Sequence, residues 1–343
     1  MLTAVVVGAA GYVGGEVLRL LLGHPNVTVR AALSRTFAGH RVDGVHPNLR
    51  GATNLIFAPS DDIPASDVLF LATEHGRSAE LLSRSPHIAQ SAAIVIDLSA
   101  DFRLTDEALH QGYYPKAQRP LEWATTFVPG WPERHREALR TANRISVPGC
   151  MAMAGMLALH PLAAADILEP DVIVDAKTGS SGSGATALEQ NLHAERSGAM
   201  RVFAPHGHRH EAEMAQSTGL RVHMTATGVE AVRGVQVLCH ARSREPIEAR
   251  TLYRIYREAY GNEPFVRVVA QRQGRYRLPE PKILLGSNYC DVGFALDPEG
   301  HRLTLIAALD NLMKGGAGNG IQCLNVRMGW SERLGLEFQG LHP

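Results

Sequence analysis

The sequence predicts an α/β protein with two domains, the first built on a parallel sheet and the second an α+β domain with a mostly antiparallel sheet. Its 343 residues, 45% of them hydrophobic, favour two cores over one. The first 150 residues alternate short valine- and isoleucine-rich runs with helical patterns, as β-α-β units do. Beyond residue 170, strand-like runs predominate, which indicates the α+β domain.

The first expected strand, Leu2 to Val7, leads into a glycine-rich turn and then a helical pattern from Glu16 to Leu22. Glycines at such a turn let the backbone approach a pyrophosphate, which the helix N-terminus then stabilises. A turn without a ligand is the alternative, but the strand–turn–helix context favours a Rossmann-type dinucleotide site. The expected cofactor-binding residues of this turn are Gly8, Ala10, Gly11, Tyr12, Val13 and Gly14.

The second expected strand, Val27 to Leu33, ends in Ser34, Arg35 and Thr36. A site that prefers NAD usually carries an acidic residue here for the ribose 2′-OH. A hydroxyl and an arginine suit a 2′-phosphate instead, so we expect these three residues to bind NADP. The alternative is that Arg35 is a solvated loop charge.

Two more parallel strands are expected at Val68 to Ala72 and Ile94 to Leu98, with a helix from Arg77 to Ser83 between them. The segment Asp97 to Arg103 follows at the carboxyl end of a strand, the edge where open α/β sheets bind ligands. Arg103 is therefore a candidate for gripping a phosphate or carboxylate. A surface ion pair with Asp101 or Asp106 explains it equally well.

Cys150 follows a short β run, Ile145 to Val147, and a Pro-Gly corner, and it opens an apolar helix reaching about His160. A thiol at a helix N-terminus faces unpaired backbone N–H groups and the positive end of the helix dipole, which favour the nucleophilic thiolate. The alternative is a buried small hydrophobe, as most free cysteines are.

The second domain is expected to begin with a strand from Val172 to Lys177 and a Gly/Ser-rich loop, residues 178–185. The loop is either a flexible linker or the lining of a ligand site, and Gly182 is a candidate cofactor contact. A helix from Pro246 to Tyr260 has its proline at the first helical position. Further strands are expected at 222–227, 235–240, 265–269, 289–296 and 303–309, and a Gly-rich segment, 310–318, leads into a last helix ending near Arg327.

Three histidines alternate with other residues at His206, His208 and His210. No carboxylate or cysteine constellation supports a metal site, and none is expected. An acid–base histidine that serves a thiolate is the better interpretation, with Glu213 three residues after His210 and able to orient it on a helix.

Composition limits the class of protein. The formal net charge is zero, so no nucleic-acid partner is expected, and no apolar run of the N-terminus is long enough to span a membrane. Four cysteines lie far apart without a C-x-x-C pair, which fits a reducing compartment. We therefore expect a cytoplasmic protein.

In chain order, five motifs resemble the N-acetyl-gamma-glutamyl-phosphate reductase family: the glycine turn at 8–14, Asp-Leu-Ser-Ala-Asp-Phe-Arg at 97–103, Pro-Gly-Cys at 148–150, Gly-His-Arg-His at 207–210 and Asp-Asn-Leu-x-Lys-Gly at 310–315. Segments 34–39, 46–55 and the tail from Asn325 are similar to a narrower branch, whose substrate is tethered to a small acidic carrier protein of the LysW type in lysine biosynthesis. Some members of that branch also serve arginine synthesis.

The resemblance implies NADPH-dependent reduction of an acyl phosphate to a semialdehyde through a Cys150 thioester, in a homodimer or homotetramer. It implies His210 as acid–base with His208 as the weaker candidate, Arg103 as phosphoryl ligand and Asn311 as a cofactor contact. The chain departs from the family at Ala10, at Met151 to Ala154 after the nucleophile, and at Thr126 to Pro132.

The resemblance also sets the domains: residues 1–149, completed by about 311–343, would bind NADP, and residues 150–310 would carry catalysis and oligomerisation. Reduction of free N-acetyl-glutamyl phosphate is the nearest alternative. A catalytically dead dinucleotide sensor would need neither Cys150 nor His210, and a metal hydrolase would have no use for the glycine turn. Aminoadipyl and glutamyl substrates differ by one methylene, which changes binding by only about 1–3 kcal/mol.

Overall fold

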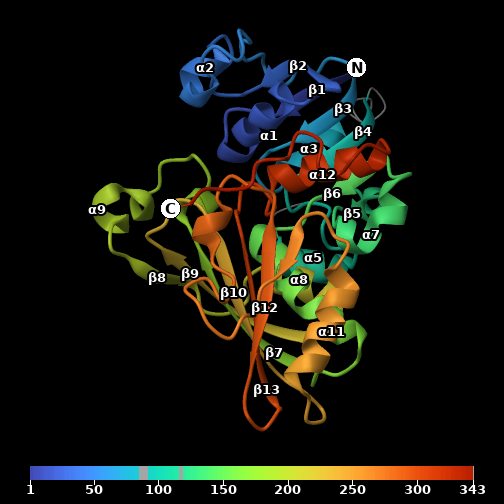
Figure 1. Cartoon of the computed structure of the whole chain (residues 1–343). Helices are drawn as coiled ribbons and strands as arrows, with labels where there is room; N and C mark the ends of the chain where they lie inside the picture. The colour runs from blue at the N-terminus through green and yellow to red at the C-terminus, as the bar shows by residue number, and fades with distance from the viewer. Residues whose placement is uncertain (85–91, 116–118, 343) are drawn as a thin grey trace. The chain divides into compact units, whose positions relative to one another are not determined.

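The computed structural model describes residues 1–84, 92–115 and 119–342, and the chain divides into two compact units (Figure 1). Unit 1 contains Met1–Pro148 and Gly316–Glu337, and unit 2 contains Gly149–Gly315 and the residues from Phe338 onward. The part of the chain that returns to unit 1 therefore starts at Gly316 instead of about 311 and ends at Glu337, since the residues from Phe338 onward belong to unit 2.

Unit 1 has the predicted Rossmann-type architecture, a six-stranded parallel sheet in the order β2-β1-β3-β4-β6-β5. The strand order reverses direction beside β1, and the carboxyl ends of the strands at such a point form the ligand-binding edge. Most residues of the central strands are buried, as expected where helices cover a parallel sheet. The strands are β1 (Leu2–Val7), β2 (Val27–Leu33), β3 (Ser66–Leu71), β4 (Ala92–Asp97), β5 (Val128–Pro129) and β6 (Arg144–Ser146).

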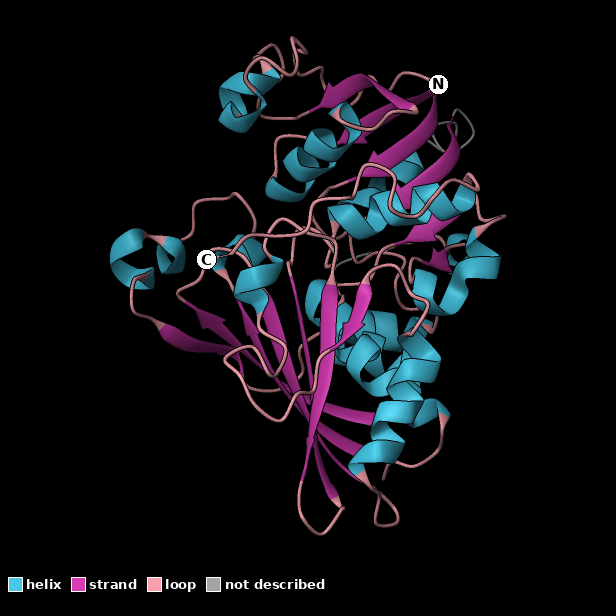
Figure 2. Ribbon diagram, in the orientation of Figure 1, coloured by secondary structure: helices cyan, strands magenta, loops and turns pink. Residues whose placement is uncertain are grey.

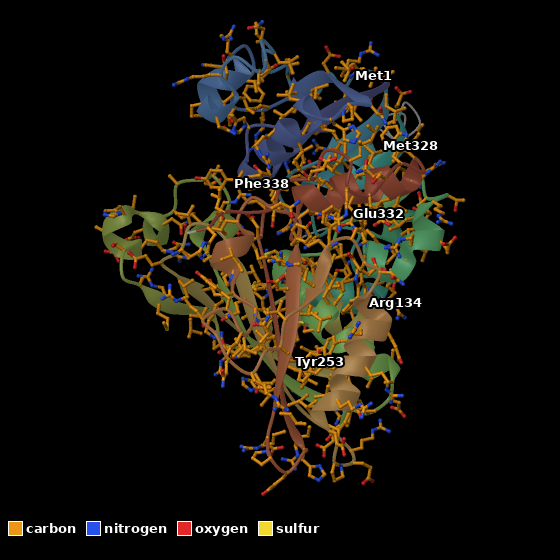
Figure 3. The ribbon with its side chains drawn as sticks, viewed as in Figure 1. Met1, Arg134, Tyr253, Met328, Glu332 and Phe338 are labelled. Carbon is orange, nitrogen blue, oxygen red and sulfur yellow. The ribbon has the colours of Figure 1, made fainter. Side chains whose placement is uncertain are left out.

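The returning helix α12 (Ala317–Arg327) is almost wholly buried in unit 1, against α1 and α7. Glu332, labelled in Figure 3, follows α12 and accepts hydrogen bonds from Arg136 Nε of α7 (2.8 Å) and Gln322 Nε2 of α12 (2.9 Å). The other helices of unit 1 are α1 (Tyr12–Leu22), α2 (Val42–Val45), α3 (Arg77–Arg84), α5 (Glu107–Tyr113), α6 (Leu121–Ala124) and α7 (Pro132–Leu139).

Unit 2 is built on a seven-stranded mixed sheet in the order β11-β12-β13-β10-β7-β9-β8. Its pairings are mostly antiparallel, as predicted, with β11–β12 and β7–β9 parallel. In β7 the side chains alternate: Val172 and Val174 are buried, whereas Ile173 between them is 60% exposed. The strands are β7 (Asp171–Thr178), β8 (Met200–Ala204), β9 (Arg221–Val229), β10 (Val235–Arg242), β11 (Val266–Val268), β12 (Cys290–Leu296) and β13 (Arg302–Leu309).

Helices α8 (Cys150–Ala164), α9 (His193–Arg196), α10 (His210–Thr218) and α11 (Ala249–Tyr260) complete unit 2, with α8 packed against β10 and β13 (Figure 2). Helix α8 continues past the predicted end at His160 and contains Pro161. A proline leaves the carbonyl four residues earlier without its helical donor. The hydroxyl of Tyr260, on α11, donates to that carbonyl, Leu157 O, at 2.8 Å, so the helix can continue.

Two details of unit 2 correct the prediction. The helix expected from Pro246 begins at Ala249, because Ile247 N donates to Gly300 O (2.9 Å) and Glu248 is extended, with φ −92° and ψ 147°. Strand β8 was not predicted, because it lies at the sheet edge with four of its five residues exposed and so lacks the alternation of a half-buried strand.

Among the described residues, no helix has the length and apolar character that crossing a membrane requires.

Candidate active site

The glycine-rich turn of unit 1 is shaped by two positions that exclude any side chain. Gly8 has φ +75°, and a Cβ atom there would lie 2.3 Å from Ala72 O. A Cβ atom on Gly14 would lie 2.3 Å from Gly8 O, whereas one on Gly11 would meet that oxygen at an ordinary 3.5 Å. The turn therefore packs backbone directly on backbone between β1, β3 and the start of α1.

Helix α1 begins at Tyr12, directly after the turn and earlier than the predicted Glu16. Gly11 caps it without a side-chain hydrogen bond, and its first turn carries no acidic residue. Tyr12 is 47% exposed, and Ala10 and Val13 are partly buried. The positive end of the helix is thus left for an anion, which fits the pyrophosphate of a dinucleotide.

His46 supports this turn, a role that sequence analysis missed. Its Nε2 lies 2.8 Å from Ala9 O, and its ring fills the space that a Cβ atom on Gly15 would need, 2.4 Å from Cε1. The only signal in the sequence was the position of His46 in one of the branch segments.

The segment after β2 presents Arg35 and Thr36 to solvent, whereas Ser34 is buried. The Ser34 Oγ accepts a hydrogen bond from Phe37 N at 3.1 Å, which closes the loop. Within the residues that the structure describes, the Arg35 side chain has no hydrogen-bond or ion-pair partner. The guanidinium is therefore available to a ligand at this edge of the sheet.

Asp97 and Asp101 form a buried carboxyl pair at the carboxyl end of β4. Asp97 accepts hydrogen bonds from Ser78 Oγ (2.8 Å) and from Ser99 Oγ (2.9 Å). Asp101 accepts from Gly76 N (2.6 Å) and Ala79 N, so it caps the start of α3. Burial, and then the charge of Asp101, raise the pKa of Asp97 to about 7. These carboxyls hold the loop at this edge in place.

Arg103 lies half-buried beside this pair and donates from Nε to Val147 O (2.8 Å) and from Nη2 to Leu98 O (3.0 Å). The two carboxylates considered as its partners have other donors: Asp101 those just named, and Asp106 the N–H of Leu109 at 2.8 Å. The backbone contacts orient the guanidinium at the segment that leads to Cys150.

Cys150 is the first residue of α8, and Gly149 is its N-cap. The His210 ring occupies the space that a side chain at position 149 would need: a Cβ atom on Gly149 would lie 2.1 Å from His210 Nε2. Gly149 N donates to Glu213 Oε2 (2.9 Å), and Glu213 Oε1 lies 3.9 Å from His210 Nε2. The cysteine, the histidine and the carboxylate predicted to orient it therefore meet at one corner of unit 2, and α10 begins at His210.

His208 lies at the same corner but has a different environment. Its Nδ1 accepts a hydrogen bond from His210 N (3.2 Å), and the two ring centroids are 4.6 Å apart. Burial, and then the charge of Arg209, lower the pKa of His208 to about 4. This ring is therefore neutral near pH 7 and holds the first turn of α10.

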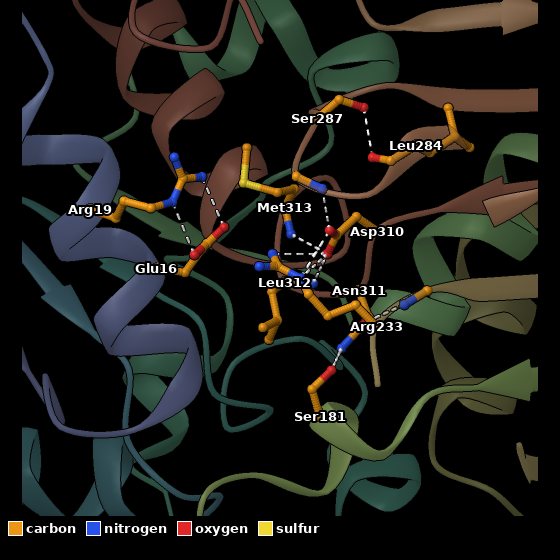
Figure 4. Close-up of polar contacts among 12 residues, drawn as sticks. Glu16, Arg19, Ser181, Arg233, Leu284, Ser287, Asp310, Asn311, Leu312 and Met313 are labelled. Carbon is orange, nitrogen blue, oxygen red and sulfur yellow. Dashed lines mark hydrogen bonds and ion pairs between the residues drawn. The ribbon is translucent and has the colours of Figure 1, made fainter. Parts of the chain in front are cut away.

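The segment Asp310–Gly315 also contacts the corner, and its own polar contacts are drawn in Figure 4. The buried Asp310 carboxylate pairs with Arg233 (Nε–Oδ2 3.0 Å) and accepts from Gly286 N and Leu312 N. A Cβ atom on Gly315 would lie 2.5 Å from Cys150 Cβ, so the end of this segment lies directly on the cysteine.

Asn311 connects two loops of unit 2. Its Oδ1 accepts from Gly234 N (2.8 Å), and its Nδ2 donates to Ser181 Oγ (2.9 Å). Ser181 belongs to a 3-10 turn, Ser180–Ser183, whose exposed Gly182 is one of the predicted cofactor contacts. The Gly/Ser-rich loop is thus an ordered turn inside unit 2, and its interpretation as a flexible linker is wrong.

The predicted site residues fall into two groups, one in each unit. Unit 1 contains the glycine turn with Ser34, Arg35, Thr36 and Arg103, and unit 2 contains Cys150, His208, His210, Gly182 and Asn311.

Among the described residues, no group of three or more histidine, cysteine, aspartate and glutamate side chains is arranged to hold a metal ion.

Comparison with known proteins covers both units. Residues 3–142 match the semialdehyde dehydrogenase NAD binding domain, and residues 150–311 match the semialdehyde dehydrogenase dimerisation domain. A putative [LysW]-L-2-aminoadipate 6-phosphate reductase of Thermomicrobium roseum is 45% identical, and the match covers 100% of this chain and 99% of that protein. The [LysW]-L-2-aminoadipate 6-phosphate reductase of Deinococcus radiodurans is 43% identical over 99% of this chain and 98% of its own length.

Solved structures show the same fold. Aspartate semialdehyde dehydrogenase II of Vibrio cholerae has a TM-score of 0.69 at 17% identity, covering 96% of this chain and 99% of that one. Aspartate semialdehyde dehydrogenase with NADP from Candida albicans has a TM-score of 0.68 at 14% identity, covering 95% and 98%. The two matched domains and the full-length matches to the reductases show that this chain is an oxidoreductase that belongs to the semialdehyde dehydrogenase family.

Proposed function

We propose that this protein reduces a carrier-linked acyl phosphate, [LysW]-L-2-aminoadipate 6-phosphate or the corresponding glutamyl phosphate, to its semialdehyde with NADPH. The names of the relatives support this substrate, since those of Thermomicrobium roseum and Deinococcus radiodurans are named for aminoadipate. A relative from Natronomonas pharaonis, 45% identical over 99% of this chain, is named for both aminoadipate and glutamate. The reaction belongs to lysine biosynthesis, and arginine biosynthesis would use the glutamyl substrate.

The observation that carries the proposal is the corner formed by Cys150, His210 and Glu213. The Cys150 thiolate, favoured by the N-terminus of α8, attacks the acyl carbon, and the bond to phosphate breaks as the thioester forms. Splitting the reduction in this way replaces one difficult step with two easier ones. A nicotinamide cofactor, when bound, supplies the hydride that reduces the thioester.

We assign His210 the proton transfers. Its Nε2 faces Gly149 and so lies next to Cys150, where it can take the thiol proton and hold it while negative charge develops on the acyl oxygen. Glu213 would stabilise the protonated ring from 3.9 Å. His208, whose Nδ1 is occupied by a backbone N–H, is assigned to substrate binding instead.

The residues of unit 1 fit an NAD(P) cofactor. The backbone-on-backbone contact at Gly8 and Gly14 and the uncapped start of α1 suit a pyrophosphate. We propose NADP over NAD because Arg35 lies exposed in the loop after β2, without the acidic residue that an NAD site carries. We also propose that Arg103, oriented by its two backbone contacts, binds the phosphoryl group.

The domain roles follow from the same assignments. Unit 1 would bind the cofactor, and unit 2 would carry the nucleophile and the subunit contacts of a homo-oligomer, which the matched dimerisation domain supports. All four cysteines are free, which fits a reducing compartment, and we propose the cytoplasm.

The reverse reaction tests the proposal. Semialdehyde, phosphate and NADP⁺ are supplied, and NADPH formation is followed with the semialdehyde either linked to the carrier or as the free N-acetylated compound. We expect kcat/KM for the carrier-linked substrate to exceed that for the free one by at least about tenfold, and Cys150→Ser to abolish both activities. Cys239→Ala is the matched control, because burial raises the pKa of that thiol to about 12 and it cannot serve as a nucleophile. Higher kcat/KM for the free N-acetylglutamyl compound would replace the carrier-linked substrate with the free one.

A further inference from the structure

Residues 34–58 form a loop, here called the 34–58 loop, that leaves the sheet at the end of β2 and returns beside it. Ser34 N donates to Ala58 O (3.0 Å) at the base of this loop, and further along Gly39 N donates to Phe57 O (2.8 Å). These bonds join the two arms of the loop, so a contact made by one arm also restrains the other.

One side chain of the 34–58 loop, His46, reaches the glycine-rich turn. Its Nε2 lies 2.8 Å from Ala9 O, and since a carbonyl oxygen can only accept a hydrogen bond, Nε2 is the donor. The same ring fills the space beside Gly15, where a Cβ atom would lie 2.4 Å from Cε1. Its other neighbour is Phe57 of the loop, edge to face, with ring centroids 6.2 Å apart. The His46 ring therefore lies between the loop and the turn and contacts both.

Ala9 also connects the turn to the start of the loop. Its N–H donates to Leu33 O (3.0 Å), at the end of β2 and directly before Ser34 and Arg35. The N–H of Ala9 is thus bonded to the strand that leads into the loop, and its carbonyl is bonded to His46 within the loop. The turn proposed for the pyrophosphate and the loop that carries Arg35 are therefore joined at two places.

The turn and Arg35 are assigned to different phosphates of one cofactor. When one molecule makes two contacts, the second contact strengthens binding only if the two subsites lie at the separation that the molecule spans. NADPH has both the pyrophosphate and the 2′-phosphate, whereas NADH has only the pyrophosphate. A residue that fixes the separation of the two subsites should therefore matter more for NADPH than for NADH.

We propose that His46 is a positioning residue of the cofactor site, which fixes the separation between the pyrophosphate turn and Arg35 and so contributes to a preference for NADPH. His46 acts through Ala9, Gly15 and the 34–58 loop, without a contact to the cofactor. This proposal rests on the proposed function, because it requires NADP to bind in unit 1.

The test measures the Kd of NADPH and of NADH by nucleotide fluorescence, without any acyl substrate. For His46→Ala we expect the Kd of NADH to rise about 3- to 10-fold, as for the loss of one hydrogen bond that holds the turn, and the Kd of NADPH to rise a further 3- to 10-fold. His46→Gln, whose side-chain amide can donate to Ala9 O, should recover most of both losses. Asn48→Ala, at an exposed position of the same loop, is the matched control and should change neither Kd.

Three results are decisive for His46→Ala. Equal losses for the two nucleotides would mean that His46 supports only the turn, and unchanged Kd values would mean that it supports neither subsite; both results overturn the proposal. Wild-type enzyme that binds neither nucleotide would instead overturn the proposed function.

Two double-variant cycles test the coupling directly. Gly15→Ala should displace the His46 ring and raise the Kd of NADPH, but add little in the His46→Ala background, where the ring is gone. Arg35→Ala should likewise weaken NADPH binding less in His46→Ala than in the wild type. Strict additivity in both cycles would overturn the proposal. Gly15→Ala alone, by lowering the preference for NADPH, tests it even if His46→Ala does not fold.

Discussion

The glycine turn of unit 1 and the cysteine corner of unit 2 are built in opposite ways. The turn is formed by backbone atoms, those of residues 8–14 and, from after β3, Ala72 O, which approach because Gly8 and Gly14 have no side chains. The corner is formed where three separate segments meet, the starts of α8 and α10 and residues 310–315, with Gly149 making room for the His210 ring and Gly315 for Cys150. The glycine motif of the first site is therefore visible in the local sequence, whereas the second site depends on side chains that only the tertiary fold brings together.

Replacing one glycine with alanine at each site should impair thioester formation and NADPH binding separately. In Gly149→Ala the new Cβ would displace the His210 ring, so we expect thioester formation to slow by about 10² to 10⁴-fold, the usual contribution of a general acid–base. Its Kd for NADPH should stay unchanged. Gly11→Ala fits without a clash but obstructs the approach of a pyrophosphate, so it should raise the NADPH Kd and leave thioester formation intact. Changes of both quantities in both variants would mean that the sites are not separate.

The pH dependence of unfolding tests whether a buried side chain, Asp97, also contributes to the stability of unit 1. Its folded-state pKa, about 7, lies above its ordinary value of 3.8, so the native state holds the proton more tightly than the unfolded state. Stability should therefore fall as pH rises from about 4 to 7, by up to roughly 4 kcal/mol in all, and level off above that range. Asp97→Asn should remove this slope.

The measurement is denaturant unfolding followed by tryptophan fluorescence. All three tryptophans, Trp123, Trp131 and Trp330, lie in unit 1, so the signal reports that unit. A wild-type midpoint that rises between pH 4 and 7 would contradict the assignment.

Arg35 sharpens the description of the cofactor site. Arg35→Ala should raise the KM for NADPH by about 10- to 100-fold, since a charge-assisted contact to the 2′-phosphate is lost, and change the KM for NADH little. Steady-state kinetics with both cofactors gives the ratio. Thr36→Ala, at the neighbouring exposed position, tests whether a hydroxyl contributes. An equal loss with NADPH and NADH would rule out a 2′-phosphate contact.

Substitution of Asn311 has the smallest expected effect on activity, and it tests how the loops around the cysteine corner are held in place. Because Ser181 and Gly234 occupy both ends of its amide, we expect it to position the Ser180–Ser183 turn. Ser181→Ala and Asn311→Ala should then each lower kcat/KM modestly, and the double variant should be less impaired than the sum, with a coupling of about 1 kcal/mol. Strict additivity, with a raised NADPH KM in Asn311→Ala alone, would favour a direct cofactor contact.

Sequence patterns predicted the fold where structure is local. The run from Val27 to Leu33 is β2 because its apolar residues end at a polar loop, and the Pro-Gly corner placed the start of α8 at Cys150. Strand β8 escaped prediction because an exposed edge strand has no buried face to leave a pattern. The extension of α8 past Pro161 depends on a hydroxyl about a hundred residues away, on Tyr260.

The site divides in the same way. Residue types and motifs made Cys150 and His210 candidates, and the structure brings them to one corner. Nothing in the sequence could show that Asn311 bonds Ser181 and Gly234, or that Gly149 must be a glycine for His210 to fit.

The central claim is that Cys150 carries the acyl group, and it can be measured without the cofactor. Enzyme is mixed with the carrier-linked acyl phosphate in the absence of NADPH, and phosphate release and the intact mass are followed. We predict one equivalent of phosphate per active site and a mass increase equal to the carrier-linked acyl group, located on the peptide that contains Cys150 and absent in Cys150→Ser. Phosphate release that waits for NADPH, with no adduct on any cysteine, would contradict the covalent mechanism.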